Sequence, residues 1–255
     1  MIPAIKNSPQ KNKGFTLIEL LTVITIIGIL FGIAFKGADV ALIAGAKAKQ
    51  SANMRDILSA YISYNSENGP IVENINDEEM VNTDDDEVTY TSGTIHDFAA
   101  VLAEMSREMN NAEVWISARD KGAKKENRKH KATFVLDPDS DEDNQEIDED
   151  FQNSILSFNA FAGVEESEQS GASGTPVVYT AGLDEEGSWS KKAPNGRSGG
   201  HVGYLSGHVK AFKQIKEENF AEWDDPSQQT QNLKEAVNGA PLGHSAEDAF
   251  DGERE

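Results

Sequence analysis

The chain has no cysteine and few basic residues, and both shortages narrow its chemistry. Without cysteine it can form no disulfide and no thiolate metal site. It carries 23 Lys and Arg against 44 Asp and Glu, a formal net charge of -21. Nucleic-acid binding needs a basic surface, so this balance argues against a nucleic-acid partner.

One long apolar run, residues 15–35, stands out from this polar background. It follows Gly14 and contains a single charged residue, Glu19. At about 1.5 Å rise per residue the run makes a helix of roughly 30 Å, enough to span a bilayer. A cleaved secretory signal usually has a shorter apolar core and a small-residue cleavage site, and no such site follows Phe35. An ordinary membrane anchor would leave Gly14 and Glu19 unexplained, because a carboxylate in hydrocarbon is costly without a partner.

The segment Lys13-Gly14-Phe15-Thr16-Leu17-Ile18-Glu19, with the apolar run behind it, resembles the type IV prepilins, a class that includes the pseudopilins of type II secretion. The resemblance implies cleavage between Gly14 and Phe15 by a prepilin peptidase, and methylation of the new Phe15 amine. Glu19 of a neighbouring subunit can pair with that amine as subunits stack, which would set their axial register. The implied partners are identical or related pilin subunits in a helical filament and an inner-membrane assembly platform.

The distribution of charge predicts an orientation and a domain order. The leader carries three lysines and no acid, so it is expected to stay in the cytoplasm. The acidic remainder is expected in the periplasm, on an inner-membrane protein with one span, and later in a periplasmic or surface filament. The expected order is a leader (1–14), a transmembrane helix in contact with lipid or a filament core (15–35), the periplasmic half of that helix (36–69), a globular head (70–225) and a flexible acidic tail (226–255).

The helix that starts at Phe15 is expected to continue to about Asn65. Ala, Leu, Lys, Gln and Met favour helix here, and Asn68-Gly69-Pro70 is a strong stop. Gly28 and Gly32, four residues apart, would permit another helix to approach closely. One face of the second half is expected to pack on the head, through Ala44, Ala48, Ile57, Leu58, Tyr61 and Ile62.

The head is expected to be α+β and pilin-like, with a small antiparallel sheet on the long helix. Thr94 predicts a helix start, with Asp97 completing a capping box. The helix following it would extend to Asn110 and turn Phe98, Leu102, Met105 and Met109 inward. Two strands are predicted outside the hairpin described next, at Glu113–Ser117 and around Val177-Val178-Tyr179.

A glycine-rich hairpin is predicted near the carboxyl end of the head, with runs 201–205 and 208–212 joined by Ser206-Gly207. Its sequence resembles a motif of proteins related to the major pseudopilins. In that motif an aspartate usually stands directly before the glycine that corresponds to Gly207. Here that position holds Ser206. Tyr204 and Phe212 are expected to face the core, with Val202 or Val209 according to register. The matching positions are Gly199, Gly200, His201, Gly207, His208 and Val209, after a loop with Gly182, Asp184, Gly187 and Trp189.

Several loops carry strong charge and are read first as solvated segments. These are the acidic stretch 71–93, the basic stretch 121–131 and the acidic run 137–143. The last departs from a calcium-binding EF-hand, because Glu142 stands where the loop needs glycine and Asp148 where it needs glutamate. No cofactor is expected, although loose calcium binding to this run stays open. A short helix is considered for Asn232–Val237.

Two functions are compatible with these features. The first is a non-enzymatic subunit of a type II secretion pseudopilus or a type IV pilus-like filament. The second is a membrane-tethered periplasmic enzyme or binding protein that uses a prepilin-type signal. The second needs a convergent polar site, and no such set can be assigned. His201 and His208 are interpreted as structural, because no third ligand lies nearby in the sequence.

Overall fold

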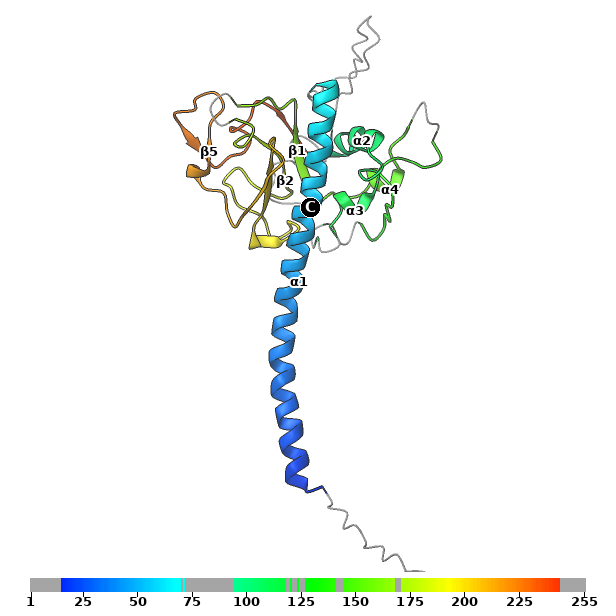
Figure 1. The fold of residues 1–255 in the computed structure, drawn as a ribbon, viewed down its shortest axis with the longest axis vertical. Coiled ribbons are helices and arrows are strands. Elements are labelled where there is room, and N and C mark those ends of the chain that lie inside the picture. The colour runs from blue at the N-terminus through cyan, green and yellow to red at the C-terminus, as the bar shows by residue number, and fades with distance from the viewer. Residues whose placement is uncertain are drawn as a thin grey trace, which may run out of the picture. The chain divides into compact units, whose positions relative to one another are not determined.

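The structure is a computed structural model that describes residues 15–69, 71, 94–117, 120, 123, 127–140, 145–167 and 171–243. For residues 33–40 and 240 it describes the backbone alone. The described chain is α+β and pilin-like, as the sequence predicts, with a long amino-terminal helix, shorter helices and a small antiparallel sheet (Figure 1). It divides into two compact units, Met1–Ala44 and Gly45–Glu255.

The long helix α1 runs from Leu17 to Asn68, so it continues well past the apolar run. Its end is set by Gly69, whose φ of 81° suits glycine and whose N–H donates to the carbonyl of Asn65 over 3.1 Å. The expected inward face is correct for Ile57, Leu58 and Tyr61, all fully buried, and for half-buried Ile62. It is wrong for Ala44 and Ala48, which are exposed.

Near its start, the second unit fixes α1 through polar rather than apolar contacts. Gln50 is buried; its Nε2 donates to Ser117 Oγ over 3.2 Å and its Oε1 accepts from Asn195 Nδ2 over 2.6 Å. Met54 then begins the apolar core. Polar groups such as Gln50, followed by Met54, therefore hold α1 on the head, and the alanines do not.

The helices α2 (Ile95–Met105), α3 (Ala112–Trp115) and α4 (Glu149–Gln152) follow in the head. The capping box of Thr94 and Asp97 is confirmed, but α2 ends five residues before Asn110 and leaves Met105 exposed, whereas Met109 is buried. The predicted strand over 113–117 is wrong. Asn111 accepts a hydrogen bond from the Glu113 N–H and starts the short helix α3, which buries Trp115.

The main sheet has five antiparallel strands in the order β4-β3-β2-β1-β7. The predicted hairpin is confirmed as β3 (Gly200–Tyr204) and β4 (Val209–Phe212), and the predicted strand lies within β2 (Pro176–Thr180). β1 (Phe158–Ala162) and β7 (Ala240–Leu242) were not predicted. Outside the sheet lie two 3-10 turns, η1 (Gly196–Ser198) and η2 (Glu217–Asn219), and a small ribbon of β5 (Phe220–Ala221) and β6 (Gln229–Thr230).

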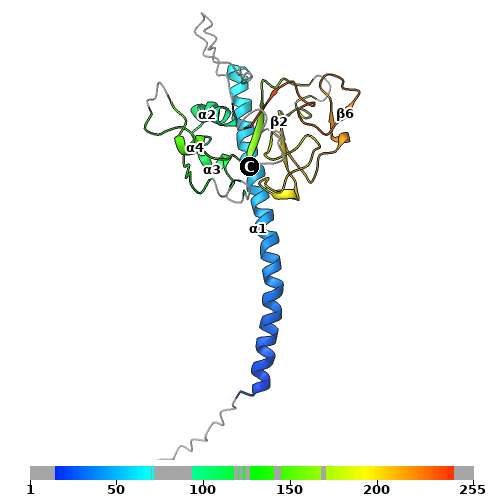
Figure 2. The same cartoon turned by 180° about the vertical axis from the view of Figure 1, so that it is seen from behind.

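Within the second unit, the strands lie on one side of α1 and α2–α4 on the other (Figures 1 and 2). Every residue of β1, β2 and β3 is buried, because side chains cover both faces of the sheet. At Gly203 of β3 a methyl group would stand 2.6 Å from Leu58 Cδ1, so strand and helix meet without a side chain between them. On the opposite face, Phe220 stacks 6.2 Å from Tyr204.

The expected tail from residue 226 is structured as far as Gly243. β7 pairs with β1, and Leu233 and Leu242 are buried in the core. Residues 233–236 form a turn rather than the short helix considered above. Residues 244–255, and the acidic stretch 71–93 apart from Ile71, lie outside the described residues.

Candidate functional site

The start of α1 is a capping box built from Thr16 and Glu19. The Glu19 carboxylate accepts from the Thr16 N–H over 2.9 Å and from the Thr16 hydroxyl over 2.7 Å, both at Oε2. The Thr16 hydroxyl in turn accepts from the Glu19 N–H over 3.3 Å. Two backbone donors that the helix leaves unsatisfied are thereby bonded. Phe15 precedes this box and is 76% exposed, and Gly14 lies outside the described residues.

This geometry gives Glu19 a local role that was missed in the sequence. Thr16-Leu17-Ile18-Glu19 fits the S/T-x-x-E pattern of a capping box, and the same pattern was recognised at Thr94. Both hydrogen bonds use Oε2, and no hydrogen bond to Oε1 joins the described residues. Glu19 can therefore cap its own helix and still accept a further donor.

The described first turns of α1 expose apolar side chains in every direction. Twelve large side chains are between 44% and 88% exposed: Phe15, Leu17, Ile18, Leu20, Leu21, Val23, Ile24, Ile26, Ile27, Ile29, Leu30 and Phe31. A contiguous apolar surface of this kind marks a contact with lipid or with another protein. Gly28 and Gly32 have no atom within 4 Å of an added methyl group, so their surroundings are open to a closely packed neighbour.

A transmembrane helix was expected over residues 15–35. Among the described residues, no helix combines the length and the apolar character needed to cross a membrane.

The glycines of the hairpin motif have steric reasons to be glycine. Gly207 (φ 82°) forms the turn, where its N–H donates to Tyr204 O over 2.8 Å, and Gly199 (φ 90°) lies against the backbone of Phe212. At Gly200 a methyl group would stand 2.5 Å from Cε2 of Trp189. The Trp189 indole donates to Thr180 O over 2.9 Å and is buried. The motif thus packs the loop of Trp189 against β2 and β3.

The two motif histidines lie on opposite faces of the hairpin. His201 pairs with Ala211 and shares its face with Gly203, toward α1. His208 stacks on Tyr204 with ring centroids 4.2 Å apart, on the other face. Since neighbouring residues of a strand point to opposite faces, the two rings do not form a shared metal or catalytic site. Of the two valines considered for the core, Val202 is fully buried and Val209 half-buried.

The environments of the histidines differ accordingly. Burial, with Lys47 and Arg55 nearby, lowers the pKa of His201 to about 4, and no hydrogen bond to its Nδ1 is found in the described part of the chain. His208 is exposed and lies 2.7 Å from the Ser206 hydroxyl through Nδ1; partial desolvation and Lys210 lower its pKa. Ser206, which replaces the usual aspartate, therefore bonds to His208 within the turn.

A serine-hydrolase pattern in the sequence has the wrong structural setting. Gly196–Gly200 reads Gly-Arg-Ser-Gly-Gly and fits G-x-S-x-G, a match missed at the level of sequence. A nucleophile elbow needs a strand-to-helix turn, whereas Ser198 ends the 3-10 turn η1 ahead of a strand. Its carbonyl accepts from Lys47 Nζ over 2.7 Å, and no bond from its hydroxyl to a histidine appears among the described residues.

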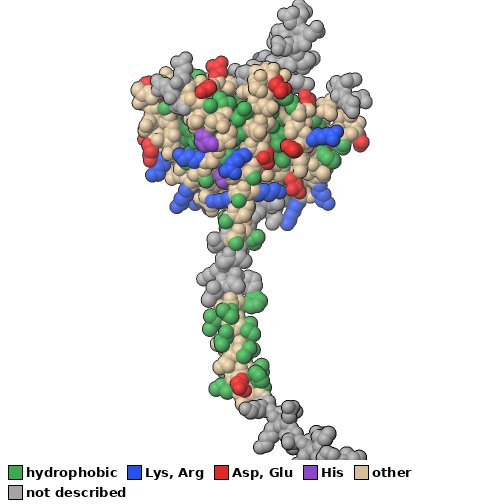
Figure 3. Space-filling view, in the orientation of Figure 1, with side chains coloured by type: hydrophobic (Ala, Val, Ile, Leu, Met, Phe, Trp, Pro, Cys, Tyr) green, Lys and Arg blue, Asp and Glu red, His purple; other side chains and the backbone are tan. Residues whose placement is uncertain are grey.

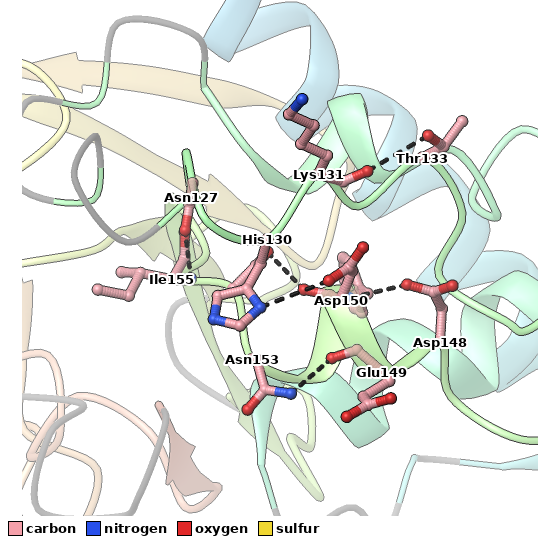
Figure 4. A network of polar contacts seen from close by, with 11 residues as sticks. Asn127, His130, Lys131, Thr133, Asp148, Glu149, Asp150, Asn153 and Ile155 are labelled. Atoms are coloured by element: carbon pink, nitrogen blue, oxygen red, sulfur yellow. Dashed lines mark hydrogen bonds and ion pairs between the residues drawn. The ribbon is translucent and has the colours of Figure 1, made fainter.

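The acidic segment around α4 uses its carboxylates locally. Asp137 accepts from the Asp139 N–H and Asp148 from the Phe151 N–H, each over 2.9 Å. His130, from the basic stretch, lies 3.4 Å from Asp150 of α4 (Figure 4), which is outside the acidic run 137–143. Residues 141–144 lie outside the described residues. Among the described residues, no cluster of three or more His, Asp or Glu that could hold a metal ion is found. Calcium binding stays a prediction.

Comparison with known proteins identifies a family motif in the amino-terminal segment. Residues 9–35 match the family described as the prokaryotic N-terminal methylation motif. The chain therefore carries the prepilin-type signal of type IV pilins and pseudopilins. No curated protein and no solved structure matches the chain.

Proposed function

We propose that this protein is a structural, non-enzymatic subunit of a pilin-type filament, either a type II secretion pseudopilus or a type IV pilus-like fibre. The observation that carries the proposal is the combination, in one segment, of the methylation motif with a helix that exposes apolar side chains all round from Phe15 to Phe31. When the helix leaves the lipid, packing these side chains against those of neighbouring subunits would keep a large apolar area out of water, which stabilises the filament.

Processing is the first step of the proposal. A prepilin peptidase cuts the chain between Gly14 and Phe15, and the new amine is methylated. Phe15 precedes the first turn of α1, and its side chain is largely exposed. The leader remains in the cytoplasm and the head is exported, an orientation supported by the lysines of residues 1–14 and the acidic remainder. Subunits are held at the inner membrane and added to the filament by an assembly platform.

Register between neighbouring subunits is the second step. The Phe15 amine of one subunit donates to the Glu19 carboxylate of the next, where Oε1 can accept while Oε2 continues to cap α1. A charge-assisted contact in an apolar surrounding is strong only when its geometry is satisfied, so it selects one axial offset between helices. The hairpin motif holds the head together and has no catalytic role in this proposal.

Three substitutions separate the local role of Glu19 from its role in assembly. Glu19→Gln keeps a side chain that can complete a capping box but removes the charge. Thr16→Ala removes the hydroxyl half of the box and keeps the charge, whereas Glu19→Ala removes the carboxylate half together with the charge. The native amino terminus is measured by mass spectrometry, and assembly by the fraction of protein in sedimented filaments.

We expect all three variants to begin at Phe15. Glu19→Gln and Glu19→Ala should lower the filament fraction at least about tenfold, whereas Thr16→Ala should keep more than about half of it, since losing a cap costs about 1 kcal/mol. If Glu19→Gln assembles to the same extent as the protein without the substitution, Glu19 acts only as a cap. An amino terminus at Met1, or one beyond residue 35, would refute prepilin processing.

A further inference from the structure

The head of this acidic protein contains a basic groove. Its volume is about 900 Å³, and it lies between the loop 184–197 and residues 213–216. One carboxylate, Asp184, lines it together with five cations: Lys191, Lys192, Arg197, Lys213 and Lys216. Figure 3 shows Lys and Arg side chains gathered along the lower edge of the head. A surplus of cations is unexpected in a chain of net charge -21.

Glu185 and Glu186 of the loop are exposed but do not line the groove, so its lining keeps a surplus of positive charge. Asp184 accepts from the Ser188 N–H over 2.6 Å, so its carboxylate closes its own loop. Lys216 lies 3.7 Å from Glu218, with both side chains exposed. Within the described residues, no ion pair involves any of the other four cations. The groove is therefore suited to an anionic group from another molecule.

The walls of the groove are held by contacts of the loop that precedes the hairpin motif. The Ile215 N–H donates to Gly187 O over 2.8 Å, which ties the two walls together, and a methyl group on Gly187 would stand 2.4 Å from Ile215 O. Trp189, buried beneath, is fixed by its bond to Thr180. A partner would bind to a preformed surface, which lowers the entropic cost of association.

The opposite side of the head carries the complementary charge. In Figures 1 and 2, α4 lies on the far side of α1 from the strands that flank the groove. Residues 137–140 and 145–150 hold six carboxylates, against three Lys and Arg in the adjoining residues 127–131. Asp148 and Asp150 have local partners, whereas Glu146 and Glu149 are exposed and have no ion pair among the described residues. We call residues 137–140 and 145–150 the acidic flank.

We propose that the basic groove of one subunit binds the acidic flank of a second copy of this chain. The two surfaces lie on opposite sides of one molecule, so the contact is heterologous and repeats from copy to copy, as a helical array requires. It also offsets the mutual repulsion that strongly acidic heads meet when packed together. This inference rests on the proposed filament function and adds a contact between heads to the contact between helices.

The test uses the full-length protein as it is processed in cells, in an equal mixture of unlabelled and nitrogen-15-labelled chains. A carbodiimide joins amines to carboxylates that are in direct contact, and mixed-isotope peptides identify links between copies. We expect mixed links from Lys191, Lys192 or Lys213 to Glu146, Glu149 or Asp150. Their yield should fall several-fold between about 0.15 M and 1 M salt, since the screening length drops from about 8 Å to 3 Å.

Charge reversal sharpens the result. The pair Lys191→Glu and Lys213→Glu leaves Lys192 as the unchanged lysine of the three expected to link, and should lower the yield of its mixed links about tenfold. Adding Glu146→Lys with Glu149→Lys should restore much of the yield of the Lys192–Asp150 link. Lys234→Glu, an exposed reversal outside the groove, should change it less than about twofold. Mixed links from the groove lysines to other carboxylates, or only links within one chain, would overturn the inference.

A second readout separates this inference from the filament function. The chain has no cysteine, so Ile24→Cys in the exposed part of α1 reports contacts between helices by disulfide formation. Helix disulfides without links between groove and flank would overturn only the contact proposed here. Loss of both would overturn the filament function as well.

Discussion

Two parts of one helix use similar side chains in opposite ways. In the first unit, Leu30 of α1 is 60% exposed, and the other large apolar side chains from Phe15 to Phe31 are exposed as well. In the second unit, Leu58 of the same helix is fully buried, against Met54 on its own face and β3 of the sheet. The second part satisfies its apolar surface within the chain, whereas the first leaves that surface for another molecule. Apolar composition alone does not distinguish a core from an assembly surface.

The largest expected effect comes from truncating one leucine in each part. Leu58→Ala removes a buried side chain and should lower the free energy of unfolding of the head by about 2–5 kcal/mol. Leu30→Ala should change it by less than about 0.5 kcal/mol, because the side chain is exposed in the isolated subunit. Urea unfolding followed by tryptophan fluorescence compares them, since Trp115 and Trp189 are buried in the head. Equal losses for the two variants would remove the contrast.

Acid should weaken the head through His201. Its pKa is about 4 in the folded state against 6.5 without perturbation, so between these pH values the unfolded chain binds the extra proton. Stability from this group is complete above about pH 6.5 and is lost as the pH falls toward 4, by about 2 kcal/mol. Denaturant midpoints at pH 7 and pH 4.5 measure the loss. His201→Gln should reduce that pH difference, and an unchanged difference would assign it to other groups.

A smaller effect is expected from adding one methyl group at a glycine. Gly200→Ala forces the new carbon against Trp189 and should cost about 1–3 kcal/mol, with a change in tryptophan emission. Gly45→Ala is the matched control on α1. It meets no atom within 4 Å and should stabilise the helix by about 0.5–1 kcal/mol. Thermal unfolding of both variants tests the opposite signs. A neutral Gly200→Ala would show that Trp189 can move aside.

Local patterns predicted the elements whose causes are local. The capping box at Thr94, the stop at Gly69 and the turn at Gly207 each depend on a few adjacent residues, and the structure contains all three. The strands β1 and β7 pair across nearly eighty residues, and this pairing structures part of a polar segment that resembles a tail. Such partners are invisible to a local pattern. Trp115 shows a further limit, because an alternating run became a helix turn once Asn111 capped it.

The candidate site also contains residues that local spacing identifies and features that depend on the fold. Gly14, Phe15 and Glu19 were identified because their spacing is specific, and the family match covers them. The capping role of Glu19 follows from a local pattern as well, because Thr16 stands three residues before it. The separation of His201 from His208 depends on strand register, and the basic groove joins residues of two separate loops. Neither could be read from the sequence without the fold.

The most direct measurement of the central claim is contact between the exposed parts of α1 in assembled protein. Ile24→Cys, in a chain without other cysteines, is oxidised in cells that assemble the filament and in a matched Glu19→Gln background. The account predicts disulfide-linked dimers that carry Phe15 as the first residue and decrease at least about fivefold in the Glu19→Gln background. Ile24→Cys that stays monomeric under assembly conditions would contradict the claim that this surface joins subunits.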